Sequence, residues 1–264
     1  MGAEEAKCPK CGSGDRQQKK GFTGGGSQRF FCGACKHKYT PRPKKWAYSA
    51  AERALALRLL VLGNSGRAVG KVLGMCRSNA YRWAIEEAEK KNGVWTSAET
   101  DRGAFELDEL HWHVGGRKGH ENGANAYVMT MTSGFPRQIV GFAVESSVNA
   151  RAAQGIVDVA VAAANYFTDG ATAYLDVDFP GQHRRNVRDK SDTHEVESVN
   201  ADLRHYISGL ARRSRCFFRK LSTLRAVLRI FVDAYNKFGE AKMRWRETHP
   251  GCGRDFGFNH SQFV

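Results

Sequence analysis

Four of the seven cysteines fall into two Cys-x-x-Cys pairs near the start of the chain. Cys8 and Cys11 form the first pair, Cys32 and Cys35 form the second, and 20 residues separate the pairs. Tetrahedral zinc takes four thiolates, and each short pair supplies two of them from one tight turn. This pattern indicates a metal site in a reducing compartment rather than disulfides. We expect a zinc ribbon over residues 1–45, in which structural Zn²⁺ holds together a segment too short to bury much core.

Three carboxylates far apart in the sequence form a second group, Asp108, Asp169 and Glu197. Carboxylate oxygens suit Mg²⁺ or Mn²⁺, and a pair of such ions can drive an in-line phosphoryl displacement. The spacing alone also fits a turn aspartate before Gly170 and a solvated helix glutamate. Other acidic residues compete for the same roles: Asp176, Asp178, Asp192, Glu195 and Asp202.

Basic and amide side chains accompany the third carboxylate. Asn200 and Arg204 follow Glu197 at i+3 and i+7 and so share its helix face. The sequence continues into an arginine cluster that is either a solvated helix face or a set of phosphate contacts. Beside a phosphodiester site we favour phosphate contacts. The cluster consists of Arg212, Arg213 and Arg215.

A third group of side chains suits DNA recognition. The sequence predicts three short helices within residues 46–95, the third starting near Ser78 as its N-cap, which is a helix-turn-helix pattern. Arginine and asparagine match guanine and adenine edges, although a plain three-helix packing unit shows the same pattern. The expected DNA contacts are Arg77, Ser78, Asn79 and Arg82, together with Lys44 and Lys45 in the preceding linker.

The elements beyond residue 102 change from helices to strands. Residues 105–111 and 127–132 alternate with period two, 138–144 is a third strand candidate, and 165–169 is a fourth that ends at an Asp-Gly. The helical segments are 150–164, 193–210 and 217–238. This order predicts an α/β domain over residues 102–240. No element is predicted for the polar stretch 176–192, and 241–264 forms a tail without an assigned role.

The charge distribution supports this division. The chain has a formal net charge of +14, which suggests a polyanionic partner. Acidic side chains nevertheless outnumber basic ones by 10 to 5 over residues 101–182. Carboxylates that gather cations beside a polyanion would produce such a pattern. The sequence lacks a run of about 18 apolar residues and a secretory leader, so we expect a cytoplasmic protein with no membrane partner.

His111 and His113 lie two residues apart on one predicted strand face. They could be ligands of a catalytic zinc, but no third ligand is evident nearby. Contact with DNA or packing in the core is the favoured interpretation.

Several short motifs, in their order and spacing, resemble bacterial insertion-sequence transposases of the DDE type, most closely the insertion-sequence-one type. The resemblance runs from Cys8 to about Asn236. The motifs are Cys8-Pro-Lys-Cys-Gly12, Arg29-Phe-Phe-Cys-Gly-Ala-Cys35, Glu106-Leu-Asp-Glu109 with Trp112-x-Val-Gly115, Thr168-Asp-Gly170, Val196-Glu-x-x-Asn-x-x-Leu-Arg204, Arg212-Arg-Ser-Arg-x-Phe217 and Tyr235-Asn236.

This resemblance implies a ribonuclease-H-like catalytic domain, a mixed sheet with flanking helices. It implies that Asp108, Asp169 and Glu197 are the three metal carboxylates, with Glu195 as the alternative to the third. Asn200 and Arg204 would then lie near the metals or the DNA backbone. Such enzymes bind terminal inverted repeats, cut DNA with water, and join the freed 3′-hydroxyl to target DNA as a dimer or larger assembly.

Two other functions remain open at this stage. A non-enzymatic DNA-binding regulator would use the zinc ribbon and the three helices but leaves the α/β domain unexplained. A nuclease of the same fold would cut without joining.

Overall fold

The computed structural model describes residues 6–43, 48–91, 102–116, 121–134, 137–186, 193–212, 215–250 and 259–264. Lys44, Lys45, Asp192 and Arg213 lie outside the described residues. The chain divides into two compact units, Met1–Ala50 and Ala51–Val264. In the part that the structure describes, no helix combines the length and apolar character that crossing a membrane requires.

The first unit is a small antiparallel sheet. Its strands are β1 (Gln17–Phe22), β2 (Gln28–Cys32) and β3 (Lys38–Tyr39), in the order β1-β2-β3. The core beneath them is too small to stabilise the unit by apolar burial alone. It consists of Ala6, Cys8, Phe30, Cys32 and Tyr39. Two of these five residues are cysteines, so one member of each Cys-x-x-Cys pair is part of the core itself.

Three helices open the second unit: α1 (Ala50–Val61), α2 (Gly66–Val72) and α3 (Arg77–Lys90). All three helices expected in this region are present. The Ser65 hydroxyl accepts a hydrogen bond from the Ala68 N–H and caps α2. The prediction of Ser78 as the N-cap of the third helix is wrong, because α3 begins at Arg77 and Cys76 occupies the N-cap. Ser78 lies instead in the first turn of α3.

A mixed five-stranded sheet forms the centre of the second unit. Its strands are β4 (Ala104–Val114), β5 (Ala124–Ser133), β6 (Gln138–Glu145), β7 (Asn165–Thr168) and β8 (Gln182–Arg185), in the order β6-β5-β4-β7-β8. The strands β4, β5 and β6 are antiparallel neighbours, whereas β7 runs parallel to β4 and β8 parallel to β7. The four strands expected from the sequence are therefore present. The strand β8 and the 3₁₀ helix η2 (Thr172–Asp176) add elements in or beside the polar stretch that lacked a prediction.

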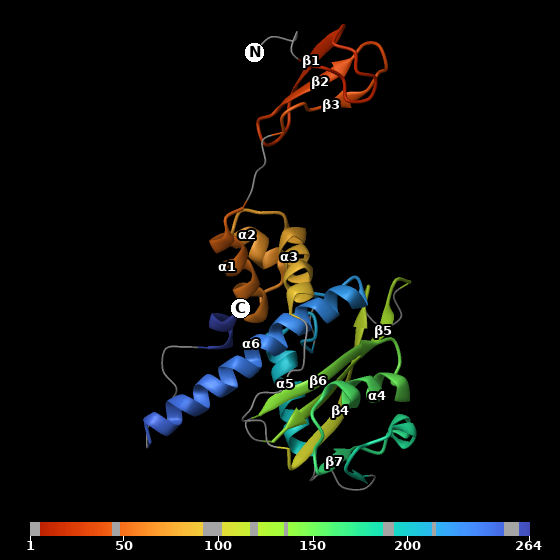
Figure 1. Ribbon diagram of the computed structural model, residues 1–264, viewed down its shortest axis with the longest axis vertical. Coiled ribbons are helices and arrows are strands. Elements are labelled where there is room, and N and C mark those ends of the chain that lie inside the picture. The colour runs from red at the N-terminus through yellow and green to blue at the C-terminus, as the bar shows by residue number, and fades with distance from the viewer. Residues whose placement is uncertain are drawn as a thin grey trace. The chain divides into compact units, whose positions relative to one another are not determined.

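Helices cover both faces of this sheet, as expected for a mixed sheet with flanking helices (Figure 1). The helix α4 (Ala150–Val159) packs on one face through a core that includes Phe105, Leu107, Met129 and Met131. The helices α5 (His194–Tyr206) and α6 (Leu221–Thr248) contact β4, β5 and β6. Because neighbouring side chains of a strand point to opposite faces, the even-numbered residues of β4 meet α5.

The helix α6 connects the sheet with the three N-terminal helices. It contacts both β6 and α3, and Lys91 forms an ion pair with Asp233. It begins later than expected and continues to Thr248, so residues 241–248 of the expected tail are helical. The short 3₁₀ helix η4 (His260–Phe263) packs on α6, and the His260 ring bonds to the Val61 carbonyl of α1.

Candidate metal centres and active site

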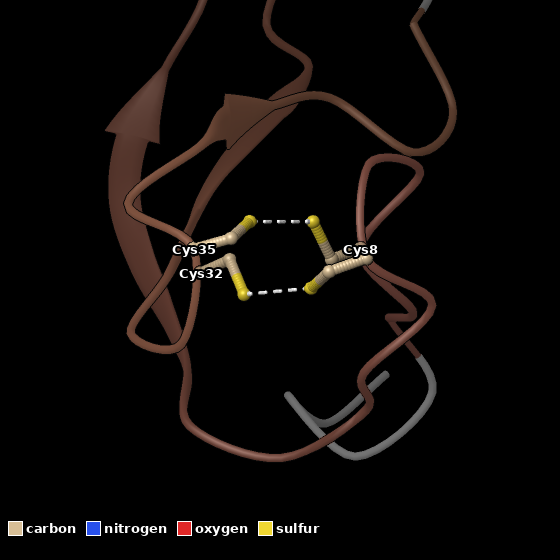
Figure 2. A group of neighbouring side chains, drawn as sticks. Cys8, Cys32 and Cys35 are labelled. Carbon is tan, nitrogen blue, oxygen red and sulfur yellow. Dashed lines mark hydrogen bonds between the residues drawn. The ribbon is translucent and has the colours of Figure 1, made fainter.

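The four paired cysteines converge at one point in the first unit (Figure 2). The Sγ atoms of Cys8 and Cys35 lie 3.5 Å apart, and those of Cys11 and Cys32 lie 3.7 Å apart. All four Sγ atoms lie within 4.8 Å of one another. Zinc–sulfur bonds of 2.3 Å in a tetrahedron require sulfur atoms roughly 3.8 Å apart. The geometry therefore fits a four-thiolate zinc ion.

Hydrogen bonds stabilise the thiolate form of one of these sulfurs, the Sγ atom of Cys32. The Gln17 amide donates to the Cys32 Sγ at 3.4 Å, and the Tyr39 hydroxyl holds that amide by donating to its oxygen at 2.8 Å. The backbone N–H of Cys35, followed by the Gln17 amide, lowers the pKa of Cys32 to about 6. Zinc binds the thiolate form, and these hydrogen bonds favour the thiolate of Cys32.

A second cluster combines Asp108, Glu109 and Asp169. One carboxylate oxygen from each lies within 4.8 Å of the other two. The strand β7 pairs with β4 only as far as Leu107, opposite Thr168. Asp169 is the next residue of the chain, so it reaches the β4 carboxylates at the point where this pairing ends. The structure thus brings together two carboxylates that are 61 positions apart in the sequence.

Glu109 is the member of this cluster that sequence reasoning missed. Strand alternation places it on the face opposite Asp108. Its presence within the Glu-Leu-Asp-Glu segment was the available signal. The Tyr174 hydroxyl of η2 donates to the Glu109 Oε2 at 2.8 Å and holds this carboxylate in place. Burial, and then the nearby Asp169 and Asp108, raise the pKa of Glu109, while the Tyr174 hydrogen bond opposes this rise.

The orientation of Asp108 is set from α5. The buried Asn200 amide donates to the Asp108 Oδ2 at 2.9 Å, and its oxygen accepts from the Thr130 hydroxyl at 3.2 Å. These two bonds fix which end of the amide faces the carboxylate. Two residues earlier on β4, the buried Glu106 accepts the N–H of Val196 at 2.8 Å. This bond caps the start of α5, where the Thr193 side chain provides no cap.

A cavity of about 710 Å³ opens beside the acidic cluster. Asp108 and Glu109 line it together with three side chains that were expected to share one helix face, Glu197, Asn200 and Arg204. Its lining includes Asp108, Glu109, Glu197, Asn200, Arg204 and Arg212. Glu197 is exposed at this cavity but does not belong to the close three-carboxylate cluster.

The alternative third carboxylate, Glu195, is engaged elsewhere. Its Oε2 accepts a hydrogen bond from the Arg137 guanidinium, which also donates to Ser198. Asp202, another competitor, accepts the Tyr235 hydroxyl at 2.9 Å. Of the carboxylates on α5, Glu197 is the one that lines the cavity of Asp108.

Positive charge borders the same cavity. The Arg204 guanidinium lies 5.7 Å from the centre of the Trp112 ring, and Arg212 is exposed nearby. Burial, and then the neighbouring Arg212, lower the pKa of Arg204. Three clustered carboxylates could hold a divalent cation, and the two arginines could contact an anion beside it.

The other expected DNA contacts lie at the N-terminal half of α3. Arg77, Ser78 and Arg82 are exposed, and Asn79 is half-buried. The Arg82 guanidinium donates to the Asn79 side-chain oxygen at 3.0 Å, so these two residues form one polar surface. Arg215 is also exposed.

The histidine pair forms a ring contact rather than a metal-ligand group. The rings of His111 and His113 lie 4.9 Å apart, and the His111 ring also stacks on Tyr127. Among the described residues, only the four cysteines and the three clustered carboxylates form metal-ligating groups of three or more. The structure therefore adds no third ligand to this pair.

No protein-family model matches the sequence, and a search of the curated proteins found no significant match.

Proposed function

We propose that this protein is a DNA transposase of the DDE type, which cuts DNA at the ends of a mobile element and joins the freed ends to a target. The observation that carries the proposal is the clustering of Asp169 with Asp108 and Glu109, because these last two residues also line a cavity together with Glu197, Arg204 and Arg212. Carboxylates on one side and guanidinium groups on the other suit a phosphodiester held against divalent metal ions.

The sheet topology supports a ribonuclease-H-like fold for this domain. Three antiparallel strands are followed, through α4, by two strands parallel to the first of them. The first carboxylate lies on the central strand β4, the second directly follows its parallel neighbour β7, and Glu197 lies on α5 across the cavity. This arrangement is the one that the resemblance to insertion-sequence transposases implies.

Each side chain would have a separate task in this reaction. Asp108, Asp169 and Glu197 would hold Mg²⁺ or Mn²⁺, which when bound supply the activation of water or the 3′-hydroxyl and stabilise the leaving oxygen. Asn200 holds the Asp108 carboxylate in its orientation. Arg204 and Arg212 would hold the phosphodiester backbone. Glu109 would place a third carboxyl group beside the two aspartates, and burial and these neighbours raise its pKa and so favour its neutral form.

The N-terminal elements would supply DNA recognition. The zinc ribbon of residues 6–43 and the helix-turn-helix of α1–α3 would bind the terminal inverted repeats, with α3 in the major groove. The exposed Arg77, Ser78 and Arg82 support this assignment. Because both ends of an element must be joined in one reaction, we propose that the protein works as a dimer or larger assembly.

A Mg²⁺-dependent cleavage and strand-transfer assay on DNA carrying element ends tests the proposal. Asp108→Asn, Asp169→Asn and Glu197→Gln are each expected to abolish cleavage and to leave end binding nearly unchanged. Glu195→Gln is the matched control on α5 and is expected to retain cleavage, because Arg137 holds Glu195 away from the site. Cleavage that survives Asp108→Asn would overturn the site.

The products of the same assay separate the remaining functions. Joined products indicate a transposase, and cleavage without joining indicates a nuclease of this fold. Specific binding of verified end DNA without any cleavage would favour a regulator.

A further inference from the structure

A second cavity, of about 460 Å³, lies on another face of α5. Asp202 and Tyr206 of α5 line it, whereas Glu197, Asn200 and Arg204 of the same helix line the acidic cavity. An α-helix with its side chains is only about 10–12 Å across. One helix thus separates the proposed cleavage site from a second hollow of the size that holds a small ligand, roughly 300–1,000 Å³.

One face of α6 supplies most of the lining of this second cavity. Tyr235, Phe238, Lys242 and Arg246 follow one another at spacings of three, four and four residues, so they lie along one side of the helix. The Lys242 ammonium lies 5.8 Å from the centre of the Phe238 ring. Two aromatic side chains are therefore followed by two cationic ones along one wall.

The opposite walls add a ring that is held in place and a further cation. The Tyr206 ring packs edge-on against the buried His260 ring, 4.4 Å away, which fixes its position. Arg137 also lines the cavity and adds positive charge, and its guanidinium forms an ion pair with Glu195. The one acidic side chain of the lining, Asp202, already accepts the Tyr235 hydroxyl at 2.9 Å.

Three rings and three cations in one small cavity match the chemistry of a nucleotide. Bases of any sequence stack on aromatic side chains, which contributes about 1–3 kcal/mol per base. Lysine and arginine hold the attached phosphate.

We propose that this cavity binds one unpaired nucleotide of the DNA strand, with its base against Phe238 and its phosphate near Lys242 and Arg246. Taking a base out of the duplex costs a few kcal/mol, which stacking in the cavity would offset. The proposal rests on the proposed function for the identity of its ligand, and it names a subsite for the DNA beside the scissile phosphate.

Binding of single-stranded DNA to the full-length protein, without added Mg²⁺ or Mn²⁺, tests this subsite. The probes are a fluorescent oligothymidylate and an abasic oligomer of the same length and charge, measured by fluorescence anisotropy. Phe238→Ala is expected to weaken oligothymidylate binding by roughly 5- to 100-fold, the equivalent of one lost stacking contact. It should leave the abasic oligomer unaffected, and Phe238→Trp should retain both affinities.

Arg246→Ala is expected to weaken the binding of both probes, because it removes a phosphate contact. Arg244→Ala is the matched control, since Arg244 lies two residues earlier on α6 and is exposed but does not line the cavity. Equal losses for the two arginine variants would overturn the proposal. So would a Phe238→Ala variant, folded by its circular dichroism melt, that binds both probes normally or loses both equally.

Two further arms separate this proposal from others. Free thymidine monophosphate that displaces oligothymidylate at an equal nucleotide concentration would assign the cavity to free nucleotides and overturn the assignment to a strand. Asp108→Asn should remove cleavage and keep the base-dependent affinity. A wild-type protein that never cleaves but still distinguishes the two probes would disprove the proposed function and support the subsite.

Discussion

The Asn200 amide forms two hydrogen bonds that together orient Asp108 in the acidic site. Three carboxylates within 4.8 Å repel one another, and each would turn away if nothing held it. The Asn200 N–H holds Asp108, and the Thr130 hydroxyl ensures that this N–H, rather than the amide oxygen, faces the carboxylate. On the other side, the Tyr174 hydroxyl holds Glu109. The candidate metal site is therefore oriented by groups that would not touch a bound metal themselves.

Asn200→Ala is expected to lower the affinity for Mn²⁺ by about 10- to 100-fold, the usual effect of removing a partner that orients a metal ligand. Titration of Mn²⁺ followed by electron paramagnetic resonance measures this affinity. Asn125→Ala is the matched control, because Asn125 is exposed on β5 and contacts His111 instead. An unchanged Mn²⁺ affinity in a folded Asn200→Ala protein would remove Asn200 from the site.

Cys32→Ser is expected to abolish stoichiometric zinc binding, because it removes the thiol whose pKa is lowered to about 6 and one corner of the tetrahedron. The expected content, measured by atomic absorption, is one zinc ion per wild-type chain. Cys76→Ser serves as the control, since Cys76 is exposed and outside the cluster. Full zinc content in Cys32→Ser would contradict the four-thiolate site.

At the scale of elements, the sequence predicted those helices and strands in which buried residues recur at a regular spacing. Alternation along β4 and β5 reflects one face on α4 and one on α5, so both strands could be located. The strand β8, Gln-His-Arg-Arg, is an edge strand with no buried residue, and it therefore leaves no apolar pattern to detect. In the site, Asp108 and Asp169 could be paired from their places on strands. The proximity of Glu109 to these two residues could not be predicted, because it depends on where the strand β7 ends.

One buried amide contributes to the attachment of α6 to the sheet. The Asn236 side chain accepts the Ile139 N–H and donates to the Ile139 carbonyl, both at 3.0 Å. Asn236→Ala leaves both buried backbone groups without these bonds, so we expect the free energy of unfolding to fall by about 2–4 kcal/mol. Urea unfolding measures it. Lys237→Ala is the neighbouring control and should change stability by less than about 1 kcal/mol, because its ion pair is exposed.

Two glycines on facing elements should respond in opposite directions to the same substitution. A Cβ on Gly141 of β6 would lie 2.6 Å from the Ile156 Cγ2 and 3.2 Å from its carbonyl, so Gly141→Ala forces α4 away and should destabilise by about 1–3 kcal/mol. A Cβ on Gly155 of α4 meets nothing within 4 Å, so Gly155→Ala should stabilise by about 0.5–1 kcal/mol. Thermal melts of both variants check the signs, and equal signs would contradict this packing.

At the scale of the whole second unit, residues distant in the sequence meet around His260. Its ring lies against Tyr206 of α5 and Phe231 of α6, and it bonds to the Val61 carbonyl of α1. A carbonyl can only accept, so the His260 Nε2 carries the proton. The C-terminal segment thereby joins the three-helix region to the sheet-bearing region. The contact between α3 and α6 and the Lys91–Asp233 ion pair also join these two regions.

The same histidine makes the stability of this arrangement depend on pH. Burial lowers the pKa of His260, although the Val61 carbonyl and Asp202 oppose this shift. Below the ordinary histidine pKa of about 6.5 the unfolded chain takes up a proton that the folded chain refuses. The contribution of His260 to the free energy of unfolding should therefore be fully present above about pH 6.5. It should fall as the pH decreases toward the lowered pKa, by at most about 1.4 kcal/mol per pH unit.

His260→Gln keeps a donor for Val61 and removes the titration, so its urea-unfolding stability should depend less on pH between pH 7 and 5. His249→Gln removes an exposed histidine instead and should keep the wild-type dependence. If His260→Gln retained the full wild-type slope, protonation of His260 would not limit stability in acid, and the loss would have to originate at another group.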